Sequence, residues 1–141
     1  MRSNALALLA LVTLIFLIVP VTSNADWKQF DQTESMVIYL DLDKLIETEN
    51  ETYIIRNLVD FYLPQTAHPE GLQITFQSLI RYIEINCVTE ETKTHRIEFF
   101  ERVNGQGKMV LESIINSIWR SSQNESESTV FMNLVCGGRS A

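Results

Sequence analysis

Hydrophobic and polar positions alternate along most of the chain after residue 26, in short runs rich in Val, Ile and aromatic residues. This pattern is typical of β-strands with one buried face. It predicts a short strand at Trp27–Phe30, followed by longer strands at Met36–Leu40, Tyr53–Leu63, Leu72–Cys87, Thr92–Val103 and Lys108–Ile115, the last continuing towards Trp119.

Polar segments between these runs predict the turns. Asp41–Ile46 is interpreted as one helical turn with Asp41 as its N-cap. Pro64 predicts the end of its strand, because proline cannot donate to a β-ladder. Asn104–Gly107 is a strong turn signal, since glycine tolerates positive φ. The remaining predicted turns and loops are Gln32–Ser35, Glu47–Glu51, Thr66–Gly71 and Val88–Glu91.

The alternation also predicts which strand faces are buried. In the strand before Pro64, one face carries Tyr53, Ile55, Val59, Phe61 and Leu63, with Asn57 as a polar exception, while Arg56 and Asp60 lie on the other face. In the next strand the apolar positions change phase, from Leu72, Ile74 and Phe76 to Leu79, Ile83, Ile85 and Cys87. A β-bulge near Gln77–Ser78 would restore a constant core face.

The C-terminal segment changes to helical spacing. Asn124 followed by Glu127 fits a capping box, and Glu125 would add favourable charge near the helix N-terminus. Gly137-Gly138 predicts the stop, so that Cys136 is the last helical residue. The apolar stripe consists of Val130, Phe131, Leu134 and Val135. The whole pattern predicts an α+β domain, a twisted antiparallel β-sheet meander with a C-terminal α-helix packed on it.

Residues 1–25 have the features of a secretory signal peptide. Arg2 supplies a positive charge, and the apolar run Ala5–Val19 is too short to span a bilayer as a helix. Ser23–Ala25 provides the small residues of a cleavage site. We expect cleavage after Ala25, leaving a domain at 26–141 with no membrane-spanning segment; an uncleaved N-terminal anchor is the alternative.

Cys87 and Cys136 are the two cysteines. In an exported chain such a pair predicts a disulfide. A redox-active pair would favour a CxxC spacing, which is absent. A metal site would have to recruit His68 and His95 from unrelated segments without paired-ligand spacing.

Composition narrows the class of function. The chain has 141 residues, 45% of them hydrophobic, which argues for a folded single domain. Its 11 Lys and Arg against 18 Asp and Glu give a net charge of −7, and this acidity disfavours nucleic-acid binding.

No motif in the sequence predicts catalysis, a cofactor or a metal. An EF-hand loop starting at Asp41 would need Gly and Glu where Ile46 and Thr52 stand. The run Asp41, Asp43, Glu47, Glu49 and Glu51 is therefore interpreted as a solvated turn. His95 is interpreted as a surface histidine, because no nucleophile context accompanies it. Asn50 and Asn124 begin glycosylation sequons, which matter only in a eukaryotic source.

Several short motifs, in this order, resemble the surface-adhesin protein E-like family of Gram-negative bacteria. The densest stretch is Ser78–Cys87, followed by Thr94–Phe100 and the Gly105-Gln106-Gly107 turn. Tyr39 and Asp41, with Ile46 after them, also match. The family-motif residues are Trp27, Ser78, Asn86, Cys87, Gly105, Gly107 and Cys136.

The resemblance implies a non-enzymatic protein that binds host matrix or serum proteins such as vitronectin, laminin and plasminogen, and that forms a dimer. It also implies a disulfide between sheet and helix. Two family features are missing here, namely a lipidation Cys and a basic segment before Ser78, since Gln73–Gln77 holds no cation. We expect an exported binding domain in the periplasm or at the cell surface. The alternative is a periplasmic accessory or structural protein that acts through a bacterial partner.

Overall fold

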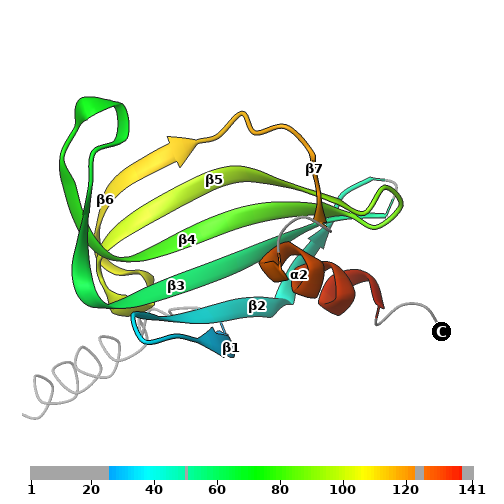
Figure 1. Ribbon diagram of the computed structural model, residues 1–141, viewed down its shortest axis with the longest axis horizontal. Coiled ribbons are helices and arrows are strands. Elements are labelled where there is room, and N and C mark those ends of the chain that lie inside the picture. Colours follow the sequence, from blue (N-terminus) through cyan, green and yellow to red (C-terminus); the bar gives the residue numbers. More distant parts are fainter. Residues whose placement is uncertain (1–25, 50, 123–125, 138–141) are drawn as a thin grey trace, which may run out of the picture.

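Strands that follow one another in the sequence lie side by side in the sheet. The computed structural model describes residues 26–49, 51–122 and 126–137, which form a seven-stranded antiparallel sheet and one α-helix (Figure 1). The sheet order is β1-β2-β3-β4-β5-β6, and β7 also pairs with β5. This arrangement confirms the predicted meander with a C-terminal helix. The bounds are β1 (Lys28–Gln32), β2 (Met36–Glu47), β3 (Thr52–Ala67), β4 (Ile74–Asn86), β5 (Glu91–Arg102), β6 (Gln106–Ile114), β7 (Arg120–Ser121) and α2 (Ser126–Cys136), with 3₁₀ turns η2 (Pro69–Gly71) and η3 (Val103–Gly105).

β2 is longer than predicted, and the interpretation of Asp41–Ile46 as a helical turn is wrong. Asp41 lies opposite Arg56 of β3 and its carboxylate accepts a hydrogen bond from that guanidinium. Asp41 is fully buried, so it does not belong to a solvated turn, whereas Asp43, Glu47, Glu49 and Glu51 are exposed. Pairing with Arg56 across the sheet has overridden the local preference of Asp for a helix cap.

β3 continues past Pro64 to Ala67, contrary to the prediction. The register with β4 changes between the pairs Asp60–Ser78 and Gln65–Phe76. Pro64 lies inside this irregularity, where the ladder needs no N–H donor. An irregularity is therefore present near Gln77–Ser78, where a β-bulge was predicted. Its additional residues, however, belong to β3 and not to β4.

The predicted continuation of the last strand towards Trp119 is also wrong. β6 ends at Ile114, and pairing with β5 resumes only at Arg120 and Ser121 of β7. Between them, the Ile115 N–H still donates to the His95 carbonyl over 2.7 Å, and the Ser117 hydroxyl donates to the Thr94 carbonyl over 2.6 Å. The chain thus leaves and rejoins the sheet edge.

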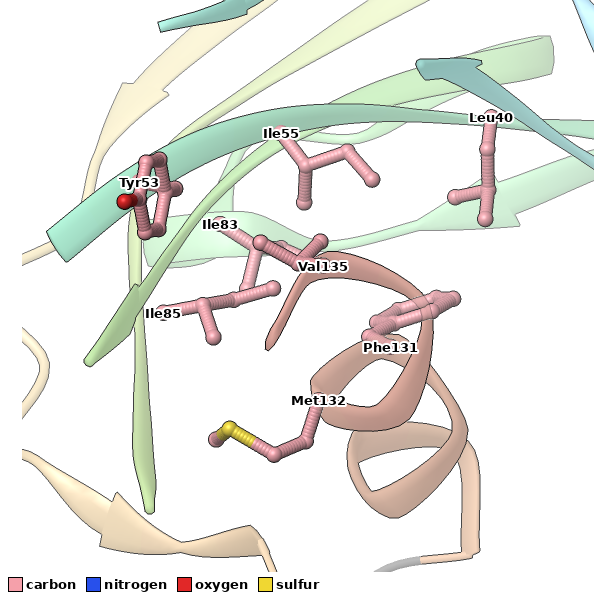
Figure 2. Close-up of a cluster of buried hydrophobic side chains, with 8 residues drawn as sticks. All are labelled: Leu40, Tyr53, Ile55, Ile83, Ile85, Phe131, Met132 and Val135. Atoms are coloured by element: carbon pink, nitrogen blue, oxygen red, sulfur yellow. The ribbon is translucent and has the colours of Figure 1, made fainter. Parts of the chain in front are cut away.

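Helix α2 packs against one end of the sheet. Figure 2 shows side chains from β2, β3, β4 and α2 meeting in one cluster. On α2, Phe131, Met132 and Val135 are buried, while Val130 and Leu134 are 42% and 43% exposed. The predicted stripe is thus partly wrong, because Met132 replaces Val130 and Leu134 on the buried face. The cluster consists of Leu40, Tyr53, Ile55, Ile83, Ile85, Phe131, Met132 and Val135.

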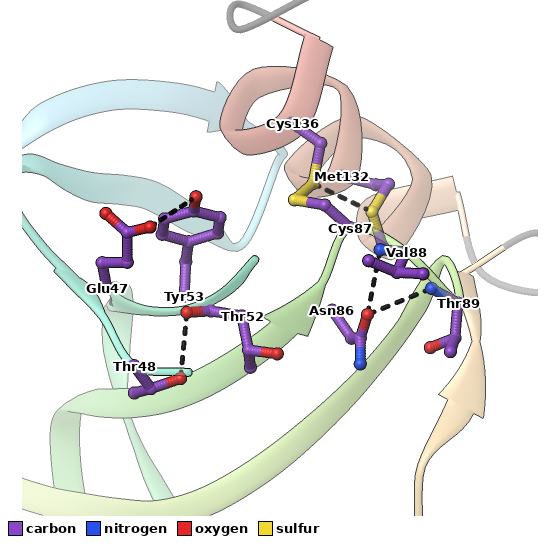
Figure 3. Close-up of a disulfide and its surroundings, with 10 residues drawn as sticks. All are labelled: Glu47, Thr48, Thr52, Tyr53, Asn86, Cys87, Val88, Thr89, Met132 and Cys136. Atoms are coloured by element: carbon purple, nitrogen blue, oxygen red, sulfur yellow. Dashed lines mark hydrogen bonds between the residues drawn. A yellow bond between two sulfur atoms is a disulfide. The ribbon is translucent and has the colours of Figure 1, made fainter. Parts of the chain in front are cut away.

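The predicted disulfide is confirmed. Cys87, directly after β4, is bonded to Cys136 at the end of α2, with a Cα–Cα distance of 5.6 Å (Figure 3). Asn86 fixes the turn that follows, because its side-chain oxygen accepts from the N–H groups of Val88 and Thr89 at 2.9 and 3.0 Å. The capping residues expected at 124 and 125 lie outside the described residues, as do Gly138 and the signal segment 1–25.

Among the described residues, no helix has the length and apolar character needed to cross a membrane.

Candidate protein-binding groove

A groove lies on the face of the sheet that carries α2. α2 lies over one end, and the β3–β4 hairpin projects at the opposite end (Figure 1). At the hairpin end, the ring of Phe76 packs against Phe61 and Phe99, with centroids 5.8 and 4.9 Å apart. Between these two ends, apolar side chains of β2, β3 and β4 line an open groove.

Three hollows that share lining residues make up this groove. The hollow over β2–β4 has a volume of about 220 Å³, the outer hollow beside β1 about 490 Å³, and the hollow beside β5 about 280 Å³. Glu127 of α2 borders all three, and Arg81 of β4 borders the first and the last. The hollow over β2–β4 is lined otherwise by Met36, Ile38, Val59, Phe61 and Leu79.

The other two hollows lie on either side of the helix, the outer one mainly apolar and the one beside β5 largely polar. The outer hollow adds Phe30, Asp31 and Val130. The hollow beside β5 combines apolar side chains, among them Ile97, Ile115, Ile118 and Phe131, with polar groups of Ser117, Ser128 and Arg120. Shallow apolar hollows with a few polar groups are suited to side chains of a protein partner.

One ion pair spans the groove. The Arg81 guanidinium donates to the Glu127 carboxylate over 2.5 Å, which joins the sheet to the first turn of α2. Arg81 also donates through Nε to the buried Asn57 side chain over 2.7 Å. Both polar residues lie on the apolar face, between Leu79 and Ile83 on β4 and between Ile55 and Val59 on β3.

The opposite face of the sheet carries a ladder of arginines and aromatic rings. Arg56, Tyr82 and Arg96 lie side by side on β3, β4 and β5. The Arg56 guanidinium is 5.2 Å from the Trp27 ring centre, and that of Arg96 is 3.9 Å from the Tyr82 ring centre. Both arginines therefore make cation–π contacts.

Carboxylates neutralise this ladder. Burial alone would lower the pKa of Arg96, but its hydrogen bond with Tyr82 and the nearby Glu98 and Glu112 carboxylates raise it overall. Arg96 pairs with Glu98 at 3.2 Å and Glu112 at 3.3 Å. The charges of Arg96 on this face are thus paired within the chain.

Ser78 holds the β5–β6 hairpin. Its fully buried hydroxyl donates to the Arg102 carbonyl over 2.5 Å and accepts from the Gly105 N–H over 3.1 Å. Gly105 has φ +65°, and a side chain there would place Cβ 2.9 Å from Ile80 Cδ1. The positive φ therefore favours glycine at this position, and any side chain there would also make the Ile80 methyl shift.

Like Ser78 and Gly105, the other family-motif residues have roles in maintaining the fold. Gly107 sits at positive φ in the same hairpin, Trp27 contacts Arg56, and Asn86, Cys87 and Cys136 hold the turn and the disulfide. None of them lines the groove hollows described above.

Arg81, Asn57 and Glu127 were not predicted from the sequence to form a site. A signal was present, because Asn57 is the polar exception in the alternation of its strand. Arg81 likewise has the parity of Leu79 and Ile83. Two polar residues at core-facing positions of adjacent strands indicate a specific hydrogen bond between their side chains.

The two histidines lie apart. His95 Nε2 lies 2.5 Å from Glu84 Oε2, and the Lys93 ammonium approaches the same carboxylate at 2.9 Å. Burial alone would raise the pKa of Glu84, but the hydrogen bonds from Lys93 and His95 lower it overall. His68 precedes η2, at the tip of the β3–β4 hairpin. Within the ranges that the structure describes, no group of three or more His, Cys, Asp and Glu side chains is arranged to hold a metal.

Comparison with known proteins shows which family the chain belongs to. The family model for surface-adhesin protein E matches residues 27–137. The solved crystal form II of protein E from Haemophilus influenzae is similar with a TM-score of 0.56, over 81% of this chain and 99% of that chain, at 14% sequence identity. At that identity the likeness shows a shared fold. A search of curated proteins gives no significant match. The family model covers most of the chain, so this chain belongs to the surface-adhesin protein E family.

Proposed function

We propose that this chain is an exported, non-enzymatic domain that binds a partner protein in the groove between α2 and the β3–β4 hairpin. The observation that carries the proposal is the open apolar face itself, in a member of an adhesin family. Apolar hollows bordered by polar groups provide the desolvated centre and polar rim found in protein interfaces. The cleaved signal peptide at 1–25 belongs to this proposal, since it would deliver the domain to the periplasm or cell surface.

The disulfide supports this function by fixing one wall of the groove. α2 is a short helix, Ser126–Cys136, and a helix of this length is marginal without tertiary contacts. The bond between Cys87 and Cys136 holds its C-terminal end on the sheet, and Phe131, Met132 and Val135 are buried against it. A partner would therefore meet a groove that is already formed, which reduces the entropy lost on binding.

Host matrix or serum proteins, such as vitronectin and laminin, are the first candidates for the partner. Gln73–Gln77 provides no positive charge, so capture would depend on apolar contacts in the groove rather than on electrostatic attraction. A bacterial protein in the periplasm is the second candidate, because the proposed signal peptide would bring the domain into that compartment. Release of the protein by osmotic shock would favour the second candidate, and its digestion by protease on intact cells the first.

Two matched variants test the groove. Val130 and Leu134 lie one turn apart on α2 and are almost equally exposed, but only Val130 lines a groove hollow described above. We expect saturable binding of the mature domain to immobilised vitronectin or laminin, weakened at least about fivefold by Val130→Gln and unchanged by Leu134→Gln.

Equal effects of the two substitutions would show that the groove is not the binding surface. No saturable binding at micromolar protein would remove the host-adhesion hypothesis. Capture of a periplasmic partner that is sensitive to Val130→Gln would then identify the alternative role.

A further inference from the structure

Arg81 is a charged residue at a position where the strand pattern calls for an apolar one. It follows Leu79 and precedes Ile83 on the apolar face of β4, and it lines two of the three hollows. Its side chain is 25% exposed, so the guanidinium is reached by solvent through the groove. A charge on an apolar face costs desolvation free energy unless it is specifically paired, so its presence calls for an explanation.

A buried amide orients this arginine. Asn57 is fully buried, and its side-chain N–H₂ donates to the Tyr39 carbonyl over 3.2 Å. This bond fixes the Asn57 oxygen so that it accepts from Arg81 Nε over 2.7 Å. Asn57 therefore positions the guanidinium, whose Nη2 donates to Glu127 and which belongs to the lining of two of the hollows.

Glu127 pairs with the terminal Nη2 of the same guanidinium, whose Nε donates to Asn57. Its carboxylate lies 2.5 Å from Arg81 Nη2, and its side chain is 35% exposed. An ion pair with this exposure is weak in water and its carboxylate can be exchanged. Arginine presents a planar set of donors that matches a carboxylate, so another carboxylate could take the same place.

We infer that Arg81 is the recognition residue of the groove, and that it binds a carboxylate of a partner segment in place of Glu127. The segment would carry an apolar side chain next to the carboxylate, because the apolar hollow lined by Leu79 adjoins the guanidinium. This inference rests on the proposed function, for which it specifies the chemistry of the partner. Charge complementarity here is local, since the chain as a whole is acidic at −7 and repels anions.

A small probe tests the inference without the partner. The probe is N-acetyl-leucine, which has an apolar side chain beside a carboxylate, and its control is N-acetyl-leucinamide, which lacks the charge. Both would be titrated into the ¹⁵N-labelled mature domain while the backbone amide signals of β4 and α2 are followed by NMR in every protein, together with the Arg81 Nε–H signal in the two proteins that keep Arg81. The comparison uses the wild-type chain, Glu127→Gln and Arg81→Gln, each checked for folding by its melting temperature.

In the Glu127→Gln variant the internal competitor is gone, so we expect the carboxylate probe to bind about fivefold more tightly than in the wild type. The amide probe should be unaffected, and Arg81→Gln should abolish the preference for the carboxylate. The inference is overturned if Glu127→Gln shows no preference for the carboxylate. In that case a Val130→Gln effect on partner capture would still support the groove as an apolar binding surface. Loss of partner capture with an intact carboxylate preference would instead reject the proposed function.

Discussion

Asp41 and Arg56 face each other on β2 and β3, with the carboxylate fully buried and the guanidinium partly exposed. Among the described residues, Asp41 Oδ1 and Arg56 Nε have no hydrogen-bond partner, so the pair is not fully satisfied. The Trp27 ring packs against the same guanidinium. This relationship ties the first residues of the domain to the centre of the sheet.

Breaking this pair from one side should be costly. Arg56→Met leaves the Asp41 carboxylate buried without a counter-charge, and we expect a loss of about 3–5 kcal/mol in the free energy of unfolding. The double variant Asp41→Leu, Arg56→Met removes both charges and should recover most of that loss. Urea denaturation of the three proteins measures the effect. A double variant no more stable than Arg56→Met alone would contradict the explanation.

The strands and the helix could be predicted from the sequence because alternation and helical spacing are local signals. Asp41 could not be placed, because its conformation is decided by Arg56, which lies far from it in the sequence and opposite it in the sheet. Pro64 was misleading for a similar reason. A proline ends a strand only where the ladder needs its N–H, and the register change that removes this need is not visible in one strand alone.

The candidate site was harder to predict than the fold. The residues that carried the family resemblance, such as Ser78 and Gly105, maintain the hairpin. The groove is the part of the apolar sheet face that α2 does not cover. Its lining therefore depends on which face of the helix is buried. Helical spacing alone predicted that Leu134 is buried. In the structure Met132 is buried instead, and Cys136 packs against the same core cluster.

The Cys87–Cys136 bond should contribute strongly to stability. The sequence separation that it closes is 49, for which chain-entropy reasoning gives about 4 kcal/mol. Cys136→Ser should therefore lower the melting temperature by many degrees and weaken any partner binding in the groove, because α2 forms one wall. Cys87→Ser and the double variant should behave alike, since each removes the same bond. An unchanged melting temperature under reducing conditions would refute this expectation.

Asp60 should make the protein less stable as pH rises. Burial raises the pKa of this carboxyl above its ordinary value of 3.8, although the hydrogen bond from the Asn104 N–H opposes the shift. The folded state thus holds the proton more tightly than the unfolded chain. Its contribution is fully present below the unfolded pKa and is lost as pH rises through the folded pKa.

The variant Asp60→Asn keeps an oxygen that can accept from Asn104 but removes the titrating charge. We expect it to equal or exceed the wild type in stability at pH 7 and to have a flatter pH profile above pH 4. Thermal denaturation from pH 3 to 8 compares the two proteins. A destabilised variant with an unchanged pH profile would show that the Asp60 charge is not the cause.

Glu84 should make the protein less stable as pH falls, which is the opposite of the effect of Asp60. Burial tends to raise its pKa, but Lys93 and His95 lower it overall, so the unfolded state binds the proton more tightly. The stabilising contribution is present above the unfolded pKa and is lost as pH falls through the folded pKa. Glu84→Gln should therefore be destabilising at pH 7, with a smaller difference from the wild type in acid. The same thermal series measures this, and a difference that grows on acidification would contradict it.

Glu70 has a backbone conformation that suits glycine better. It has φ +50° in the η2 turn at the tip of the β3–β4 hairpin, where it is exposed. Left-handed conformations cost a residue with a side chain roughly 1–2 kcal/mol, while glycine adopts them freely. Glu70→Gly should therefore stabilise the protein by about 1 kcal/mol.

Asn104 provides the matched control for Glu70. It also has a positive φ, in η3, but asparagine tolerates this region much better than glutamate does. Asn104→Gly should therefore gain less than Glu70→Gly, since less strain is relieved, and its N–H can still donate to Asp60. Urea midpoints of the two variants test the ranking. A larger gain for Asn104→Gly would mean that side-chain contacts, and not backbone strain, determine the stability of these turns.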